Sequence, residues 1–295
     1  MARSDTSPGP DGLAVIDKEP GWTSHDVVAK ARGLLGTRKV GHSGTLDPDA
    51  TGVLLLGVGR VTRLLRFLTD LPKSYVGEIV LGSETTTLDD SGDVTATYDM
   101  SGVTLAQVQE VALGFVGPIE QVPPMVSAVK IGGRRLHEIA REGREIERPP
   151  RPVTVHRLSV AASAENPDGV FRLEVDCSSG TYIRTLAADI GTALGGGAHL
   201  RRLRRTAIGS FGLADAKPLD EIELLAPSMA LRDYTSVVVD QEGAVAVGHG
   251  KPLTGLDIAE DEVGPWAVLD EAGVLLGVFV RKGPDVLKPL VVIPR

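Results

Sequence analysis

Apolar residues along the chain follow two spacings, one typical of strands and one typical of helices. A continuous apolar run at Val53–Leu56, bounded by Gly52 and Gly57, predicts a buried strand. Strict alternation over Phe171–Cys177 predicts a half-buried strand. Helical spacing predicts helices after Thr23, over residues 61–68 and 105–115, and after a capping segment at residues 178–181. The mixture predicts an α/β (α+β) fold in which helices flank a sheet.

The character of the chain changes twice along its length. Residues 1–11 are rich in Ser, Pro, Gly and Asp, which predicts a disordered tail. Residues 12–232 hold the long strands and helices of one large domain. From Val237 onward, short strand-like runs alternate with Gly and Pro turns, which predicts a small β-rich domain over residues 236–295. A chain of 295 residues has room for both.

Composition narrows the class of protein. The net charge of −8 argues weakly against a nucleic-acid partner, but the cations cluster at residues 130–151 and 201–205, so a basic groove remains open. Cys177 is the only cysteine, which excludes an intramolecular disulfide and predicts a small buried side chain. No apolar run reaches the length of a membrane span, and residues 1–11 have no apolar signal core. We therefore expect a cytoplasmic protein with no membrane partner.

The candidate chemistry lies in the segment Gly41–Gly57, GHSGTLDPDATGVLLLG. A residue that precedes proline avoids the helical region, so Asp47 is expected in an extended conformation on a glycine-flanked loop. A carboxylate on such a loop, next to a buried strand, is a candidate nucleophile or metal ligand. The same residue types also suit an ordinary surface turn, and composition alone favours the turn.

Two families have motifs similar to this string. Asp47-x-Asp49-x-Thr51 resembles the DxDxT signature of haloacid-dehalogenase-type phosphotransferases, in which both carboxylates face magnesium. That family places the motif after a hydrophobic strand, whereas here the apolar run comes after the motif. The longer string GHSGTLDPDATGVLLLGVGRVT resembles the catalytic motif of TruB-type tRNA pseudouridine synthases, G-H-x-G-x-L-D-P-x-A-T-G-V-L.

Further motifs of the same family occur in the same order over about residues 12–232. They are DKEPGWTS (17–24), KSY (73–75), LGSETTTLDDSGDV (81–94), QVPPMVSAVKIGGRR (121–135), CSSGTYIRTL (177–186) and AHLRRLRRT (198–206). Three positions depart from the family pattern: Glu19 is an insertion, Thr86 replaces an Asp, and His137 replaces a Tyr. The resemblance therefore rests on several motifs rather than on one.

The resemblance implies a pseudouridine synthase catalytic fold, with a mixed, largely antiparallel sheet flanked by helices, an RNA-covering flap at about residues 121–150 and a PUA-like RNA-binding domain at residues 236–295. It implies the isomerisation of uridine to pseudouridine at position 55 in the T loop of tRNA, without cofactor or metal, by a monomer. It assigns catalysis to Asp47, Tyr75 and Arg184, with Arg184 paired to Asp47. It assigns uridine contacts to His42, Tyr182, Leu203 and Lys18, and RNA-backbone contacts to Lys130, Arg134, Arg135, Arg141, Arg202, Arg204 and Arg205.

Two other functions remain possible at this stage. A magnesium-dependent aspartyl phosphotransferase built on Asp47, Asp49 and Thr51 would lose activity on chelation of metal and on Asp49→Asn substitution. A non-catalytic RNA-binding module would keep every function after Asp47→Asn.

Overall fold

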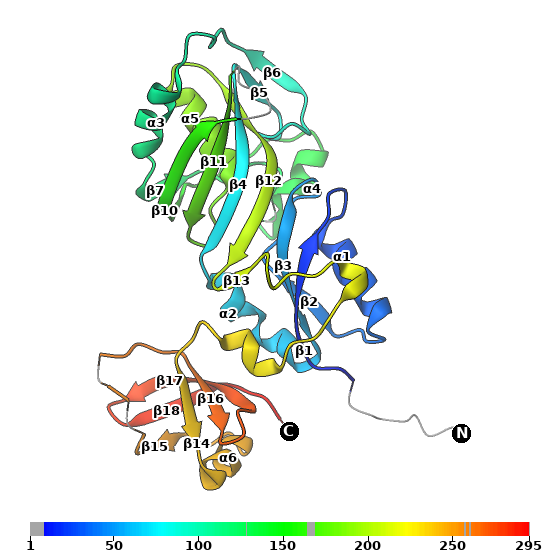
Figure 1. The fold of residues 1–295 in the computed structure, drawn as a ribbon, viewed down its shortest axis with the longest axis vertical. Helices are drawn as coiled ribbons and strands as arrows, with labels where there is room; N and C mark the ends of the chain where they lie inside the picture. The colour runs from blue at the N-terminus through cyan, green and yellow to red at the C-terminus, as the bar shows by residue number, and fades with distance from the viewer. Residues whose placement is uncertain (1–8, 128, 164–168, 257, 260, 295) are drawn as a thin grey trace. The chain divides into compact units, whose positions relative to one another are not determined.

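The computed structural model describes residues 9–127, 129–163, 169–256, 258–259 and 261–294, and the chain forms two compact units (Figure 1). The first comprises Met1–Pro48, Gly52–Thr69 and Gly209–Arg295, and the second comprises Asp49–Thr51 and Asp70–Ile208. Residues 1–8 of the predicted tail lie outside the described residues. Each unit combines separate stretches of the chain, so the predicted domains at 12–232 and 236–295 stay a prediction.

A small antiparallel sheet lies in the first unit. Strand β3 (Thr51–Val58) lies between β1 (Gly12–Lys18) and β2 (Val40–Ser43). Helix α1 (Ser24–Leu34) packs Val27, Val28 and Ala31 into one core with Leu54 and Leu56 of β3. Because β3 is buried along residues 52–58, it needs apolar side chains on both faces, which explains the uninterrupted run in the sequence. The predicted buried strand is confirmed.

The predicted helix at residues 61–68 has a different geometry at its start. Residues Gly59–Leu64 form the 3₁₀ helix η1, and only Leu65–Asp70 form the α-helix α2. A 3₁₀ helix has three residues per turn, so the apolar residues Val61 and Leu64, spaced by three, lie on one face and are both buried. The chain later returns through β13 (Phe211–Gly212), η2 (Leu219–Glu221) and η3 (Pro227–Leu231).

The last part of the first unit is β-rich, as predicted. Its elements are β14 (Ser236–Val239), α6 (Gln241–Gly248), β15 (Leu253–Thr254), β16 (Trp266–Asp270), β17 (Leu275–Gly283) and β18 (Val286–Val292). The strand order is β14-β16-β17-β18-β15, in which β14 pairs parallel to β16 and the other pairs are antiparallel. Trp266 and Phe279 are the largest side chains of its separate core.

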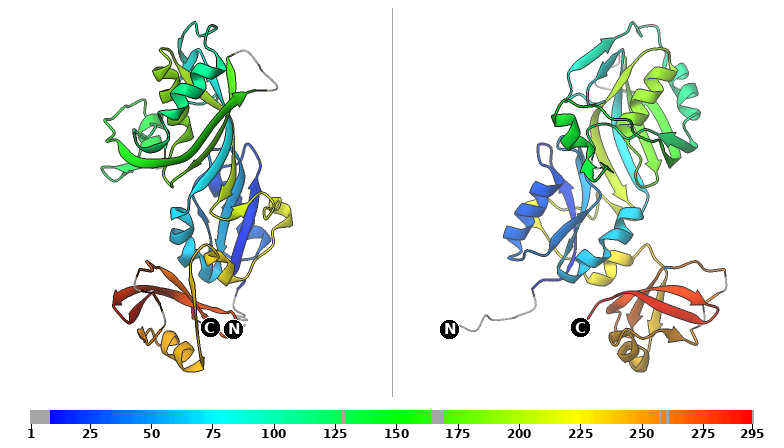
Figure 2. Two further views of the ribbon diagram at one scale, coloured as in Figure 1. Left: turned by 60° about the vertical axis from the view of Figure 1, so that its left-hand side comes forward. Right: turned by 180° about the vertical axis from the view of Figure 1, so that it is seen from behind.

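The second unit is a twisted antiparallel sheet with helices on it (Figure 2). Its strands β12 (Ala198–Ile208), β4 (Lys73–Leu81), β11 (Val170–Cys177), β10 (Arg151–Ala162) and β7 (Gly117–Gln121) are adjacent in that order. Helices α3 (Leu105–Leu113) and α5 (Ile183–Ala193) pack against the sheet and touch each other. In β11 the side chains of residues 171, 173, 175 and 177 are buried, which confirms the predicted alternation.

Two hairpins complete the second unit. Strands β5 (Ser83–Thr85) and β6 (Val94–Thr97) form one, and β8 (Lys130–Ile131) and β9 (Arg134–Arg135) form the other, which leads into α4 (Leu136–Arg141). Helices α1 and α5 have 11 residues each, and no helix in the described part of the chain is long and apolar enough to cross a membrane.

Candidate active site

The loop that carries Asp47 connects β2 to β3 in the first unit. Gly44 (φ +77°) and Gly52 (φ +101°) adopt left-handed conformations on either side of it. Such angles are strained for residues with a Cβ atom, so glycine is required at both turns. The backbone can therefore leave β2, present Asp47 and enter β3 within a few residues.

Two buried polar side chains hold this loop on either side of Asp47. The hydroxyl of Ser24, at the start of α1, accepts a hydrogen bond from Leu46 N (2.9 Å) and donates one to Leu46 O (3.1 Å). Pro48 O accepts hydrogen bonds from Lys18 Nζ (2.8 Å) and from Gly21 N (3.0 Å). Asp47 is therefore flanked by two residues whose backbone positions are fixed, which fixes the place from which its side chain starts.

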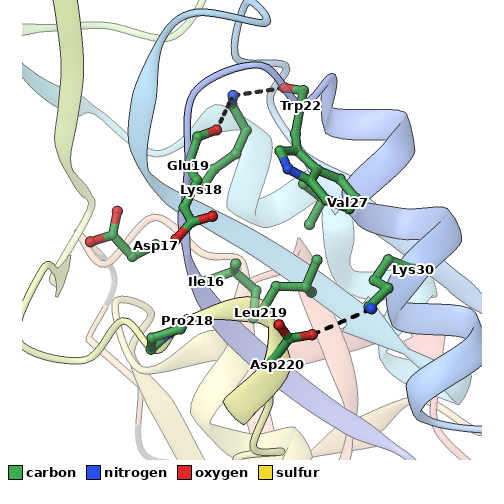
Figure 3. A pocket seen from close by; sticks show the side chains of 10 residues that line it. All are labelled: Ile16, Asp17, Lys18, Glu19, Trp22, Val27, Lys30, Pro218, Leu219 and Asp220. Carbon is green, nitrogen blue, oxygen red and sulfur yellow. Dashed lines mark hydrogen bonds and ion pairs between the residues drawn. The ribbon is translucent and has the colours of Figure 1, made fainter.

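Lys18 is 1% exposed and lies at the end of β1, beside a pocket between β1, α1 and η2 (Figure 3). Its ammonium group also donates to Glu19 O (3.0 Å) and Trp22 O (2.7 Å). Three carbonyl oxygens thus receive the three N–H donors of the ammonium group. The usual solvated state of a lone lysine does not apply here. Lys18 thus holds the Asp47 loop through Pro48 O, which indicates a positioning role, and its contact with uridine stays a prediction.

Lys18→Met is expected to lower the free energy of unfolding by roughly 2–4 kcal/mol, because three backbone carbonyls lose a buried charged donor. We also expect kcat to fall by about 10²-fold with a smaller change in KM, since a small displacement of a reacting group is costly. Urea denaturation and steady-state kinetics measure the two effects. Lys30→Met is the matched control: Lys30 pairs with Asp220 (3.5 Å) on the exposed surface, so its loss should cost less than about 0.5 kcal/mol. Equal effects of the two substitutions would contradict the assigned role of Lys18.

His42, predicted to contact the uridine, lies on β2 before the loop. Its ring packs edge-on against the ring of His25, with centroids 5.3 Å apart and planes at 82°. His25 is the second residue of α1, whose N-terminus is closed by a capping box between Thr23 and Asp26. Helix α1, whose Ser24 bonds to Leu46, thus also contacts the ring of His42.

Arg184 lies in the first turn of α5 in the second unit and is 4% exposed. Its guanidinium donates from Nη1 to Thr87 O (2.8 Å) and from Nη2 to Val126 O (2.9 Å). Its Nε lies 3.5 Å from Asp89 Oδ2. A cation in the first helical turn opposes the macrodipole, so these partners are what make the position tolerable.

Asp89 is the partner of Arg184 that sequence reasoning missed. Its Oδ1 accepts hydrogen bonds from Thr87 Oγ1 (2.6 Å), Ser91 Oγ (2.5 Å) and Ser91 N (3.1 Å), which leaves Oδ2 for the guanidinium. The loop that carries Asp89 is fixed to β12, because the backbone of Leu200 bonds to Leu88 O and to Asp90 N. The signal that could have identified Asp89 was the need of a buried arginine for a counter-charge.

Tyr182, not the predicted segment 178–181, caps α5. It is the N-cap residue, and its own side chain forms no cap hydrogen bond. The buried side chain of Gln121 takes over this role: its Oε1 accepts from Tyr182 N (2.9 Å) and its Nε2 donates to Tyr182 O (3.2 Å). The correction follows from a long-range contact that local spacing cannot reveal.

Tyr75 and Leu203 lie on the adjacent strands β4 and β12. Tyr75 is 9% exposed and faces Arg205 in the pairing register. The register of β12 shifts between Arg201 and Arg204, and Arg202 has a left-handed backbone (φ +53°). Leu203 lies within this irregularity and is half-buried, not a fully buried core leucine. Bulges of this kind redirect side chains next to functional sites.

Burial shifts the pKa of Lys73, at the start of β4, and of Cys177, which pairs with it at the end of β11. Desolvation, together with the nearby charge of Arg205, lowers the pKa of Lys73 to about 8. The ammonium group donates to Leu71 O (2.6 Å). Burial also raises the pKa of the Cys177 thiol to about 11, and its Sγ lies 3.7 Å from Lys73 O. Cys177 is buried, as predicted.

The low pKa of Lys73 predicts that the free energy of unfolding changes with pH in the alkaline range. Between about pH 8 and its ordinary value of 10.5, the unfolded chain binds a proton that folded Lys73 has released, so this group makes stability rise with pH. Cys177 acts in the opposite direction between about pH 9 and 11. The free energy of unfolding of the wild type minus that of Lys73→Met should rise by roughly 1–3 kcal/mol over this window. Taking this difference removes the contribution of Cys177, because both proteins contain it. Denaturation at pH 7.5 and 10 tests this, and a constant difference would contradict it.

The predicted RNA-backbone cations differ in exposure. Lys130, Arg134, Arg141 and Arg202 are exposed, and Arg134 pairs with Glu142. Arg204 is half-buried and donates from Nη1 to Thr51 Oγ1 (3.2 Å). Arg205 is 1% exposed, which argues against the phosphate contact predicted for it, because a guanidinium inside the unit does not reach bulk phosphate. The side chain of Arg135 lies outside the described residues.

The predicted site residues are divided between the two units. Lys18, His42 and Asp47 belong to the first, and Tyr75, Tyr182, Arg184 and Leu203 belong to the second. The ion pair of Asp47 with Arg184 therefore stays a prediction. Asp47 comes before β3 rather than at the end of a strand, and Asp49 and Thr51 follow it along the same loop and strand, unlike the arrangement that the phosphotransferase signature requires.

Comparisons with known proteins agree with the sequence motifs. Residues 32–183 match the model of the TruB family pseudouridylate synthase N-terminal domain, and residues 184–235 match the tRNA pseudouridylate synthase B C-terminal domain. A protein of Rhodococcus jostii, named tRNA pseudouridine synthase B, is 44% identical over 96% of this chain and 94% of its own. A protein of that name from Symbiobacterium thermophilum is 48% identical over 84% of this chain and 85% of its own.

Among solved structures, an H/ACA RNP bound to a substrate RNA containing 2′-deoxyuridine has a chain with a similar fold. The TM-score is 0.71 at 24% identity, over 96% of this chain and 86% of the other. The comparisons give no support to a haloacid-dehalogenase-type phosphotransferase. The family-model matches end at residue 235, so an RNA-binding role for residues 236–295 stays a prediction.

Proposed function

Because the chain belongs to the TruB family of pseudouridylate synthases, which isomerise uridine to pseudouridine in RNA, we propose that its substrate is the uridine at position 55 in the T loop of tRNA, with Asp47 as the catalytic carboxylate. The observation that carries this proposal is the fixed backbone around Asp47. Ser24 bonds both polar backbone atoms of Leu46, and Lys18 bonds Pro48 O. Such a loop holds the backbone of Asp47 in one place, as the positioning of a reacting group requires.

The reaction breaks the bond between ribose C1′ and N1 of the base and forms a bond between C1′ and C5. The C5 proton leaves, and N1 gains a proton. Oxidation state does not change, so the proposed reaction needs no redox cofactor. The role of Asp47 is to act directly at the ribose as the ionised nucleophile or base.

The uridine has to leave its stack to reach Asp47, at a cost of a few kcal/mol. We assign stacking on the everted base, worth roughly 1–3 kcal/mol, to Tyr75. His42, Tyr182 and Leu203 are assigned to the pocket for the nucleotide. Arg184, held by Asp89 and two carbonyls in the second unit, is assigned the role of the catalytic cation.

Tritium release from [5-³H]uridine in a T-arm RNA tests this proposal directly. The wild-type protein should release tritium in proportion to the pseudouridine formed, and addition of EDTA should leave the rate unchanged. Release that stops with EDTA and returns with magnesium would contradict the metal-free reaction. Failure to act on a T-arm RNA that is intact and bound would contradict the choice of substrate.

Sedimentation during turnover should show a monomer.

A further inference from the structure

A row of cations lies where η1 and α2 meet strand β18, within the first unit. Arg60, Arg63 and Arg66 donate hydrogen bonds to Pro294 O, Val292 O (2.8 Å) and Leu290 O (3.5 Å), respectively. Arg60 and Arg63 lie in η1, where three residues advance about 6 Å, close to the advance of about 6.6 Å for two residues of extended chain. These two arginines therefore meet carbonyls two residues apart, and Arg66, in α2, meets the next one at Leu290.

Arg60 is paired with a carboxylate, whereas Arg63 and Arg66 bond to neutral groups. Arg60 forms an ion pair with Asp11 and is thereby neutralised. Arg63 and Arg66 are exposed, and their hydrogen bonds go to neutral carbonyls. A guanidinium has five N–H donors, so each of these two can bind another acceptor from the solvent side. Two positive charges thus remain available at the surface.

The row continues along β18 onto the neighbouring strand β17. Lys288 lies two residues before Leu290 and pairs with Val280 of β17, and Lys282 follows Val280 by two residues on that strand. A side-chain hydrogen bond with Lys282, together with its charge, lowers the pKa of Lys288. Two neighbouring ammonium groups repel each other, and an anion between them would relieve this repulsion. One carboxylate, that of Asp285, lies in the connecting turn.

We propose that Arg63, Arg66, Lys282 and Lys288, here called the β18 strip, bind the phosphate backbone of the RNA substrate. A series of cations along one stretch of chain suits a repeating polyanion. The chain as a whole carries −8, so a local concentration of positive charge such as this one is a place where a polyanion can dock. The strip carries no base-reading group, so its contribution is independent of sequence. The choice of RNA as partner rests on the proposed function.

The test is the affinity of the full-length protein for an unmodified tRNA transcript, measured at several salt concentrations. Arg63→Glu/Arg66→Glu should weaken binding by about tenfold or more at low salt and reduce the slope of log affinity against log salt by about 2. Arg157→Glu/Arg172→Glu is the matched control. Its arginines are exposed and paired with Asp176 and Glu174, and it changes the net charge by the same amount. Equal affinity and slope for the two variants would overturn the proposal.

Two further variants separate phosphate binding from a purely structural role of the arginines. Arg63→Lys/Arg66→Lys keeps the charge but alters the bonds to β18, and should retain the wild-type slope. Lys282→Gln/Lys288→Gln leaves the η1–β18 bonds intact and should reduce the slope. If Arg63→Lys/Arg66→Lys loses as much affinity as Arg63→Glu/Arg66→Glu, the arginines only hold β18, and the proposal is wrong. Tritium release by the wild type reports on the proposed function separately, because the binding assay does not depend on turnover.

Discussion

Asp47→Asn is expected to lower pseudouridine formation by at least about 10⁴-fold, the scale of loss seen when an enzyme loses its nucleophile. Asparagine has nearly the same shape as aspartate but no charge to act at the ribose. The bonds of Ser24 to Leu46 and of Lys18 to Pro48 involve only backbone atoms of the loop, so the substitution leaves the loop held as before. Tritium release in single-turnover conditions measures the loss. Binding of tRNA should change by less than about threefold.

Asp49→Asn is the matched control for this experiment. Asp49 follows Asp47 by two residues, is exposed, and changes by the same one-atom substitution. Its variant should retain more than about half of the wild-type rate. Loss of activity in both variants would favour a pair of acids acting together, as in the magnesium-dependent alternative. Full activity of Asp47→Asn would show that Asp47 is not the catalytic carboxylate.

Arg184→Met is expected to lower the free energy of unfolding by about 3–5 kcal/mol, because it leaves the carboxylate of Asp89 and two carbonyls without their buried cation. Activity should fall by at least about 10²-fold, the effect of removing one preorganised electrostatic group from a site. Urea denaturation and tritium release give the two numbers.

A double-mutant cycle with Asp89→Asn separates the ion pair from simple loss of packing. If the pair is the cause, the double variant should be more stable than the sum of the single effects, by about 0.5–3 kcal/mol. Arg184→Lys gives a second comparison of stability. Lysine keeps the charge, but it lacks the planar guanidinium that bonds two carbonyls and a carboxylate at once. Additive effects in the cycle, or a lysine variant of wild-type stability, would contradict the network.

The elements that local patterns determine could be predicted from the sequence. The buried strand at Val53–Leu56, the alternating strand at Phe171–Cys177 and the Thr23 cap all depend on side chains close together in the chain. The β-rich character of residues 236–292 followed from short runs between Gly and Pro turns in the same way. For the candidate site, motif resemblance selected Asp47 and Arg184, but it gave no account of what holds them.

What the sequence did not reveal depends on contacts between distant residues. Gln121 lies 61 residues before Tyr182, and Asp89 lies 95 residues before Arg184, so no local spacing links either pair. The burial of Lys18 and Arg205 also could not be predicted, because charged residues are ordinarily exposed and only the folded environment overrides that tendency. The 3₁₀ start of the helix at 59–64 reflects three-residue spacing that an α-helix also accepts over one turn.

The Gln121 side chain that caps α5 also sets where the segment after it can move. Residues 121–126 are attached to the first turn of α5 at three points: Gln121 to Tyr182, Val122 O to Thr185 (3.5 Å) and Val126 O to Arg184. A movement of the hairpin β8–β9 and α4 that begins beyond Val126 leaves these bonds intact. The predicted flap would then open without displacing Arg184, the proposed catalytic cation.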